Sequence, residues 1–320
     1  MPTAATPESL SKVPPAPEPL RGSLPSEPPA DADARTIVNA LTIDVEDYFQ
    51  VSAFAPYIAR SDWDNRECRV ERNVGRILES LASRDIKATF FALGWIAERY
   101  PQLIRRIVRE GHELASHGYG HERVTDLTPA AFLEDITRAK GVLEDLSGTA
   151  VAGYRAPSFS IGTSNLWAFD SLVRAGYRYS SSIYPIKHDH YGMPDSPRFA
   201  YRVRESLLEI PITTLRMFKR NVPSSGGGFF RLLPYGLSKW MLQRVNAQDR
   251  QPAIFYFHPW EIDTAQPRIK GIDAKTRFRH YVNIERVEGR LQSLLTDFRW
   301  GRMDDIFLGR MPLAGKVSRR

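Results

Sequence analysis

The sequence holds a single cysteine, Cys68, among its 320 residues. One thiol cannot form an intramolecular disulfide, which excludes a fold stabilised by such bridges. No apolar run approaches the ~20 residues that a membrane-spanning helix needs, so we expect no membrane span. Residues 1–35 lack the apolar core of a secretory signal. From these absences we expect a cytoplasmic protein.

Composition divides the chain into three parts. Residues 1–35 are rich in Pro, Ala, Ser and Glu, which predicts a disordered tail. From about Thr36 the composition becomes that of a globular protein, and we predict a single catalytic domain over residues 36–310, including a C-terminal helical extension. Residues 311–320 are predicted to form a basic tail.

The chain carries a net charge of +7. A basic surface can attract nucleic acid, an anionic membrane or an acidic polymer. The sequence contains no recognition-helix, zinc-finger or RNP-type motif, and a solvated face with excess arginine explains the same charge. We therefore expect no nucleic-acid partner.

Apolar segments of two kinds alternate along the chain. Short, β-branched or aromatic runs predict buried strands at 36–44, 86–93, 150–156, 206–212 and 253–260. Helical spacing predicts helices at 73–85, 100–114, 129–148, 165–177, 234–246 and 283–298. The run PSSGGGFF, residues 223–230, is expected to be a flexible loop. This alternation predicts an α/β fold with parallel strands, either a barrel or a doubly wound sheet.

Acidic residues and histidines follow predicted strands, where α/β proteins usually place their sites. In LTIDVEDYF, Asp44 and Glu46 project from one face of an extended strand, whereas Asp47 begins to turn away. In SHGYGHERV, His117 and His121 are four residues apart, on a helical turn or in a tight loop, and two imidazoles at this spacing can bind one cation. Either pattern alone is more often incidental. Together they predict a metal with open positions for water and substrate.

Two further strand ends carry charged or titratable residues. Arg155 lies in GYRAPSFS, and His258 ends the apolar run in FYFHPWEID. Taken singly, Arg155 is more simply a surface ion-pair partner and His258 a hydrogen-bonded core histidine. The position of all four segments at successive strand ends favours a common site instead.

These motifs, in this order, resemble those of the NodB-homology polysaccharide deacetylases, carbohydrate esterase family four. The segments DVEDYFQVSAF, ATFFALGWIAERYP, GHELASHGYGH, YRAPSFSI, FYFHPWEID and RFRHYVNIERVEGRLQSLL most closely resemble the deacetylases associated with exosortase and exopolysaccharide gene clusters. The resemblance extends from Val38 to Phe307. It implies an α/β fold, a distorted (β/α) barrel of the NodB-homology type with fewer than eight strands.

The resemblance also implies a mononuclear divalent metal, with Zn²⁺ expected first and Co²⁺ or another transition metal as alternatives. Asp44 matches the general base, and His117 and His121 match the two metal-binding histidines. Arg155 matches the arginine that orients the base. His258 matches the general acid.

The sequence departs from the family pattern in three places. The usual first motif has adjacent aspartates, but Val45 follows Asp44, so strand periodicity makes Glu46 the third ligand and Asp47 the alternative. The tyrosine often found after the proline of the third motif is Ser158, whose backbone N–H is expected to serve as oxyanion donor. No aspartate in YRYSSSIYP pairs with the acid histidine, which leaves Asp263 and Asp189 as candidates.

Substrate contacts are expected from Pro157, Ser158 and Trp260. Other aromatic residues near strand ends that can offer flat surfaces to sugar rings are Tyr154, Phe159, Tyr184 and Tyr256. The expected partner is an N-acetylated polysaccharide or oligosaccharide, with peripheral contact to membrane-bound exopolysaccharide machinery.

The sequence therefore predicts a metal-dependent hydrolase that removes N-acetyl groups from an N-acetylhexosamine-containing polysaccharide or its precursor, in exopolysaccharide biosynthesis. One alternative is a metal-dependent amidase that acts on a small cyclic amide, as allantoinase-like relatives of the fold do. Another is a catalytically silent protein that binds glycans or assembles an export complex. The presence of Asp44, His117, His121, Arg155 and His258 argues against the silent protein, because a decayed site would more often have lost one of them.

Overall fold

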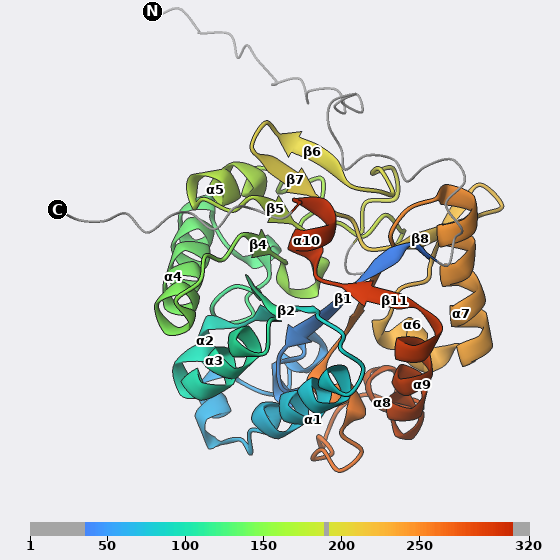
Figure 1. Cartoon of the computed structure of the whole chain (residues 1–320). Helices are drawn as coiled ribbons and strands as arrows, with labels where there is room; N and C mark the ends of the chain where they lie inside the picture. The colour runs from blue at the N-terminus through green and yellow to red at the C-terminus, as the bar shows by residue number, and fades with distance from the viewer. Residues whose placement is uncertain (1–35, 189–191, 310–320) are drawn as a thin grey trace, which may run out of the picture.

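Figure 1 shows a computed structural model of the chain, which describes residues 36–188 and 192–309. The tails predicted at 1–35 and 311–320 lie outside these residues, so the division into a domain and two tails stays a prediction. No helix in the described ranges is both long and apolar enough to cross a membrane.

A nine-stranded, mostly parallel sheet forms the centre of the fold, which confirms the expected α/β class. Its strands, in their hydrogen-bonded order, are β10 (Ile254–Phe257), β1 (Val38–Val45), β2 (Thr89–Ala92), β3 (Glu113–Ser116), β4 (Gly153–Tyr154), β5 (Tyr179–Ser180), β7 (Leu207–Glu209) and β6 (Tyr201–Arg204). β6 is antiparallel to β7, and β11 (Arg299–Gly301) adds to β1 in parallel. The parallel run from β10 to β7 has fewer than eight strands, as the resemblance implied.

No strand ladder closes the sheet into a barrel within the described residues. Between β7 and β10 the chain instead forms the hairpin of β8 (Thr214–Met217) and β9 (Arg220–Pro223). Single hydrogen bonds tie this region to β10: Ile254 N donates to Thr213 Oγ1 at 2.7 Å, and Tyr256 N donates to the carbonyl of Ser225 at 2.9 Å.

Helices surround the sheet, and Figure 1 shows α2 to α5 on the left, α1 at the bottom, and α6, α7 and α9 on the right. Their bounds are α1 (Val70–Ala82), α2 (Gly94–Arg99), α3 (Pro101–Arg109), α4 (Pro129–Ser147), α5 (Ala168–Arg174), α6 (Gly227–Leu232), α7 (Tyr235–Arg244), α8 (Ala274–Tyr281), α9 (Ile284–Asp297) and α10 (Met303–Phe307). Proline begins α3, because its missing N–H costs nothing there, and a glycine with positive φ, Gly111, follows its end. The predicted helix at 100–114 ran too far, because its last residues begin β3.

Local sequence patterns missed the shortest elements and one turn. β5 has two residues and β11 has three, too few to show a period. The run expected to be a flexible loop, residues 223–230, contains the start of α6 and a bridge from Gly226 to Tyr256. Gly226 and Gly227 have φ of 124° and 53°, a conformation that glycine permits and that hydropathy does not reveal.

Alternation along β1 aims its polar residues inward. Leu41, Ile43 and Val45 pack with α1 in the larger apolar cluster, whereas Ala40 faces the second cluster inside the curved sheet. The same period directs Asp44 to the inner face. The outward side chains hold the strand in place by packing against α1, whereas the inward side chain of Asp44 can take part in the candidate site.

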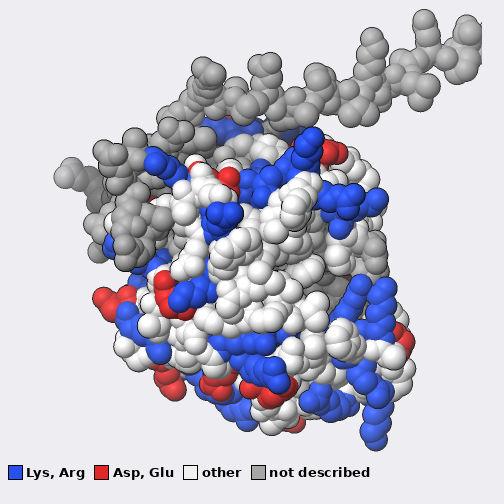
Figure 2. Space-filling model, turned by 90° about the vertical axis from the view of Figure 1, so that its right-hand side faces the viewer, with Lys and Arg blue, Asp and Glu red and all other residues white. Residues whose placement is uncertain are grey.

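Charge is uneven on the surface. On the face that Figure 2 turns toward the viewer, which is the right-hand side of Figure 1, Lys and Arg are more frequent than Asp and Glu. This agrees with the net charge of +7.

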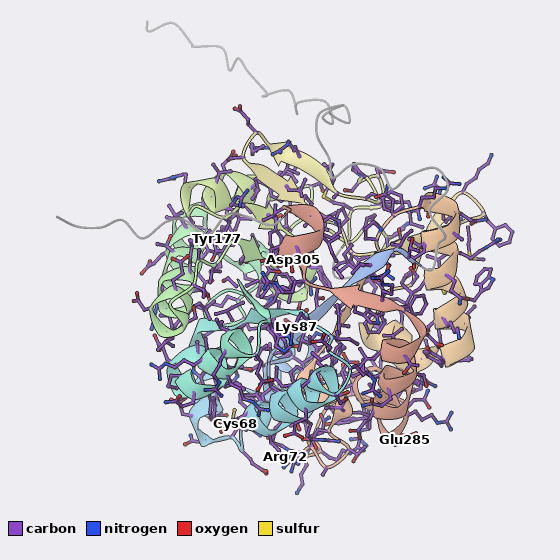
Figure 3. All side chains as sticks on the ribbon, in the orientation of Figure 1. Cys68, Arg72, Lys87, Tyr177, Glu285 and Asp305 are labelled. Carbon is purple, nitrogen blue, oxygen red and sulfur yellow. The ribbon has the colours of Figure 1, made fainter. Side chains whose placement is uncertain are left out.

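Cys68, labelled in Figure 3, is partly buried and free. Burial raises the pKa of its thiol to about 12, so Cys68 is a poor nucleophile at neutral pH.

Candidate active site

The end of β1 supplies two inward carboxylates. Asp44 is the last inward residue of the strand, and Glu46 follows a tight turn in which its N–H donates to the carbonyl of Asp44 at 2.9 Å. Both side chains are buried. The predicted placement of Asp44 and Glu46 on one face therefore agrees with the structure.

Arg155 is completely buried and fixed by four donated hydrogen bonds. One guanidinium nitrogen donates to Asp44 Oδ1 at 2.6 Å and to Thr42 Oγ1 at 2.8 Å. The others donate to the carbonyl and the hydroxyl of Ser181, just beyond β5. Arg155 is thus no surface ion-pair partner. It holds the carboxylate of Asp44 in one orientation with a charge-assisted bond.

Glu46, His117 and His121 form a cluster whose potential ligand atoms all lie within 4.8 Å of one another. His121 Nε2 is 2.7 Å from Glu46 Oε2. His117 Nδ1 lies 2.9 Å from the carbonyl of Arg155 and donates to it, which leaves Nε2 unprotonated. Burial lowers the pKa of His117 to about 4, so its imidazole is neutral near pH 7.

A loop rather than a helical turn brings the two histidines together. His117 directly follows β3, and His121 adopts a left-handed backbone with φ of 58°. Gly118 also has positive φ, and the carboxylate of Asp135 accepts a hydrogen bond from Tyr119 N. Because of this loop, two histidines four residues apart reach the same cluster without being on a helix.

The donor set fits a divalent transition metal. Glu46 Oε2 is buried and accepts no hydrogen bond, although His121 Nε2 is its close neighbour. Burial raises the pKa of Glu46, but His121, His258 and His117 outweigh that effect and hold it well below its usual range. One carboxylate and two imidazoles are a ligand set that suits zinc.

Asp47, the alternative carboxylate ligand, faces away from this cluster. Its Oδ1 accepts from Tyr48 N and its Oδ2 from Val70 N, both at 2.8 Å, and Arg69 N donates to Oδ2 as well. These bonds hold the turn after β1 and the start of α1. The choice of Asp47 as ligand is therefore wrong, because its lone pairs already serve backbone donors.

His258 follows β10 and points into the same space. Its Nε2 lies 3.3 Å from Glu46 Oε1 and 3.9 Å from Asp44 Oδ2. Its Nδ1 donates to Glu261 Oε1 at 2.6 Å. Burial lowers the pKa of His258, but the three carboxylates outweigh burial and raise it to about 9. The ring is therefore an imidazolium at neutral pH.

Glu261 is the partner of His258 that the sequence prediction missed. It is fully buried, and its second oxygen accepts a hydrogen bond from Arg231. Burial raises the pKa of Glu261, but Arg231 and His258 outweigh it and lower the pKa to about 2. The signal was present in HPWE: a glutamate three residues after the histidine, across a short turn that begins at Pro259.

The two aspartates considered for this role are not supported. Asp263 accepts hydrogen bonds from Arg69, Arg72 and Asn73, and so belongs to another network. Asp189 lies outside the described residues. The family pattern has an aspartate in this role, whereas here the longer side chain of Glu261 reaches His258 from the same strand end.

Trp260 is only 4% exposed, which contradicts its predicted place as a groove surface. Its indole stacks between His258 and His280, with centroid distances of 5.2 and 4.2 Å, and its Nε1 donates to Glu46 Oε1 at 3.3 Å. Trp260 thus supports the site by holding the ring of His258 and the carboxylate of Glu46 in position. The remaining substrate-contact candidates that prove buried are Pro157, Tyr154, Phe159, Tyr184 and Tyr256.

Ser158 is the one predicted substrate contact that stays partly exposed. It has a left-handed backbone with φ of 55°, and its hydroxyl lies 2.6 Å from that of Ser52. The neighbouring N–H groups of Phe159 and Ser160 donate to Ala156 and Pro157. No hydrogen bond from Ser158 N occurs among the described residues, so this donor is available for a ligand.

Two family models match consecutive parts of the chain. Residues 62–180 match the polysaccharide deacetylase family, and residues 181–308 match a domain of unknown function, DUF3473. The segment that matches the polysaccharide deacetylase family includes His117, His121 and Arg155. The DUF3473 part contributes β10, His258 and Glu261 to the same site.

Curated relatives resemble part of the chain. The peptidoglycan-N-acetylglucosamine deacetylase of Bacillus cereus is 34% identical over 94 residues, which are 29% of this chain and 34% of that protein. A chitooligosaccharide deacetylase of Bradyrhizobium is 28% identical over 112 residues, 35% of this chain and 49% of that protein. The chain thus spans about a third to a half of the length of these relatives.

Solved structures extend the likeness to the whole fold. A structure from Mycobacterium smegmatis that bears the name of a polysaccharide deacetylase has a TM-score of 0.57 and 20% identity, and covers 94% of this chain and 100% of that one. The PuuE allantoinase has a TM-score of 0.55 and 16% identity, with 85% and 89% covered. At these identities the likeness concerns the fold alone.

Proposed function

We propose that the protein is a metal-dependent hydrolase that removes N-acetyl groups from an N-acetylhexosamine-containing polysaccharide or its precursor. The observation that carries the proposal is the meeting, at one edge of the sheet, of Glu46, His117 and His121 with two titratable groups, Asp44 and His258. Deacetylase names among the relatives support the substrate class.

Glu46, His117 and His121 would hold the metal, and Zn²⁺ suits them best, with Co²⁺ or another transition metal as alternatives. When bound, such an ion lowers the pKa of water from 15.7 to about 7 and polarises an acetyl carbonyl. Trp260 Nε1 donates to the other oxygen of Glu46 and so orients the ligand.

Asp44 would act as general base and take a proton from the attacking water. Its Oδ1 is bound to Arg155 at 2.6 Å, which leaves Oδ2 to accept the proton. Arg155 would hold the carboxylate in the correct orientation, and so acts through Asp44 rather than on the substrate.

His258 would act as general acid. Nδ1 donates to Glu261, so the proton on Nε2 faces the space above Asp44 and Glu46, where the leaving amine would be. An amide nitrogen leaves poorly unless it is protonated, and an imidazolium held beside carboxylates can supply that proton. The N–H of Ser158 would donate to the oxyanion of the tetrahedral intermediate.

The deacetylase would belong to exopolysaccharide biosynthesis, in the exosortase-associated subgroup, with peripheral contact to membrane-bound machinery. This part of the proposal rests on the motifs DVEDYFQVSAF and RFRHYVNIERVEGRLQSLL and on the basic surface. A cytoplasmic location also stays a prediction, which cell fractionation tests.

A small cyclic amide is the second candidate substrate, because the PuuE allantoinase shares the fold. A metal-stripped sample should be assayed for acetate release from N-acetylglucosamine oligomers, with and without added Zn²⁺ or Co²⁺, beside allantoin hydrolysis. Metal-dependent acetate release supports the deacetylase. Turnover of allantoin alone favours the amidase, and stoichiometric metal binding without either turnover favours a silent glycan-binding protein.

A further inference from the structure

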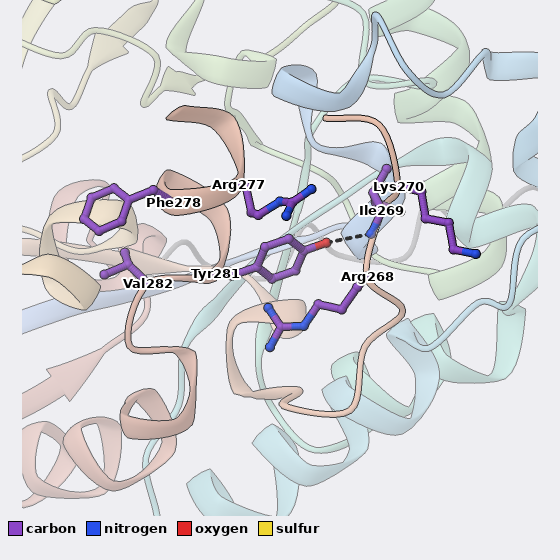
Figure 4. A pocket seen from close by; sticks show the side chains of 7 residues that line it. All are labelled: Arg268, Ile269, Lys270, Arg277, Phe278, Tyr281 and Val282. Carbon is purple, nitrogen blue, oxygen red and sulfur yellow. Dashed lines mark hydrogen bonds between the residues drawn. The ribbon is translucent and has the colours of Figure 1, made fainter. Parts of the chain in front are cut away.

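A basic depression of about 550 Å³ lies between the end of β10 and α9. Figure 4 shows Arg268 and Arg277 on either side of the Tyr281 ring, with the backbone N–H of Ile269 donating to the Tyr281 hydroxyl at 3.0 Å. Lys270 and Phe278 also line it. The depression is therefore built from one connection of the chain, with its aromatic ring fixed by a hydrogen bond.

The charge in this depression is uncompensated. Arg268, Lys270 and Arg277 are exposed and make no ion pair among the described residues, and no carboxylate lines the depression. Arg268 lies over the Tyr281 ring at 4.1 Å from its centroid, which orders that guanidinium. The nearby Asp273 instead accepts from Tyr57 Oη and from Thr276 N. The lining thus offers positive charge to an anion, and the tyrosine ring holds one of its three cations.

The depression also presents flat apolar surface. Tyr281 is partly buried, and Phe278 is 57% exposed. Flat aromatic faces beside cationic side chains suit a ring that is apolar on one face and carries an anionic substituent at its rim. A pyranose with a carboxylate has this chemistry.

The depression is adjacent to the candidate active site. The segment that forms it connects β10 to α9, and so leaves the sheet at the edge where Asp44 and His117 lie. Tyr281 contacts His280, His280 stacks on Trp260, and Trp260 stacks on His258. Only two buried rings, those of His280 and Trp260, thus separate Tyr281 from His258.

We propose that the depression is a subsite for an anionic sugar residue, so that the substrate is an acidic glycan in which such residues accompany the N-acetylhexosamine. This inference rests on the proposed deacetylase function. The cations would bind the carboxylate or an equivalent anionic group, and Tyr281 with Phe278 would contact the ring.

Calorimetric titration of the full-length, metal-stripped protein tests the subsite without turnover. The probes are an oligosaccharide that alternates glucuronate with N-acetylglucosamine and an N-acetylglucosamine oligomer of equal length. The test variant is Lys270→Gln with Arg277→Gln, which spares the stacked Arg268. The control is Arg105→Gln with Arg109→Gln on α3, two exposed arginines whose loss changes the net charge equally.

We expect tighter binding of the acidic probe, weakened by salt, and about a tenfold loss in the test variant only, because that variant lacks two of the cations that would attract the anionic group. Binding of the neutral probe should change less than about twofold. Equal affinity for both probes, or an equal effect of the control, would overturn the subsite. Sedimentation with phosphatidylglycerol vesicles adds an arm: vesicle binding lost in the test variant, without preference for the acidic probe, would assign the patch to a membrane.

Acetate release by the metal-loaded protein separates the two proposals. Release from the neutral oligomer without any preference for the acidic probe overturns only the subsite. No release from either oligomer overturns the deacetylase function, and with it the interpretation of the depression as a substrate subsite, whatever the calorimetry gives.

Discussion

At the scale of single residues, His258 depends on a buried chain of charges. Glu261 bonds its Nδ1 at 2.6 Å, and Arg231 bonds the second oxygen of Glu261. Arg231 also donates to the carbonyl of Arg279 at 2.8 Å, which fixes it in turn. The imidazole therefore has one orientation, and its charged form is favoured by neighbours rather than by solvent.

Replacement Glu261→Gln removes a charge and keeps most of the shape. We expect acetate release to fall by about 10- to 100-fold, because His258 loses the carboxylate that orients its ring and stabilises its charge. That loss lowers the pKa of His258, so the alkaline limb of the pH–activity profile should move to lower pH. Kinetics across pH measure both effects.

The matched control is Glu285→Gln, an exposed glutamate in the first turn of α9. It should leave the rate and the profile unchanged. If Glu261→Gln lowers the rate but leaves the alkaline limb where it was, Glu261 supports the fold and does not set the charge of His258.

Most of the site could be predicted from the sequence, because its acidic residues, histidines and arginine follow predicted strands. Asp44, Glu46, His117, His121, Arg155 and His258 were all chosen from the sequence, and the structure brings them together. Glu261 was missed because its role depends on a tertiary contact with Arg231. Trp260 was misjudged because sequence gives the type of a side chain and not whether another ring covers it.

At the scale of elements, β10 completes the site from the second half of the chain. It pairs with β1 in parallel over Ala40–Ile43, which aligns the ends of both strands. Among the residues that the structure describes, no strand ladder forms at its other edge, which instead receives the hydrogen bonds that involve Ser225 and Thr213. Apolar runs predicted both strands, but no local sequence pattern predicted which residues bond to the edge of β10 that faces away from β1.

At Gly226 the backbone of this region comes very close to the backbone of β10. It has φ of 124°, and a Cβ there would be 1.9 Å from the carbonyl oxygen of Tyr256. Gly226→Ala should therefore lower the free energy of unfolding by more than ~1 kcal/mol. It should also reduce acetate release, because β10 carries His258.

Gly236→Ala provides the comparison for this variant. Gly236 lies in α7, and an added Cβ meets nothing within 4 Å. Alanine there should be neutral or stabilising, by up to ~1 kcal/mol, since glycine is a poor helix former. Chemical denaturation of both variants measures the contrast, and equal stability of the two would refute the proposed role of the Gly226 turn.

At the scale of the whole molecule, one sheet joins the two matched parts of the chain. The titratable groups of the candidate site lie at one edge of this sheet, and a buried glutamate with a structural role lies at the other. The strands place the candidate site beyond their C-terminal ends, whereas Glu113 lies at the start of β3, at the opposite edge. Its carboxyl accepts hydrogen bonds from Tyr179 Oη at 2.8 Å and from Thr89 Oγ1 at 2.5 Å. Burial and the neighbouring Asp304 raise its pKa to about 8.

Glu113 should make the fold less stable as pH rises. Between about pH 4.5 and 8 the native protein keeps a proton on Glu113 that the unfolded chain has released. The unfolded state thus binds fewer protons, so the free energy of unfolding should fall with pH, by up to ~1.4 kcal/mol per unit.

Denaturant titrations of the wild type and of Glu113→Gln from pH 5 to about pH 8 measure this contribution. The variant should lose that part of the slope and gain stability relative to the wild type as pH rises. Parallel curves for the two proteins would mean that Glu113 is ionised in the native state throughout this range.

In the proposed mechanism, Glu46 binds a metal and Asp44 moves a proton. Metal content and acetate release should be measured together for the wild type, Asp44→Asn and His117→Ala, after reconstitution with Zn²⁺. We predict that Asp44→Asn binds one equivalent of metal and releases at least about 100-fold less acetate, whereas His117→Ala loses both. Full acetate release by metal-free protein, or by Asp44→Asn, would contradict the account.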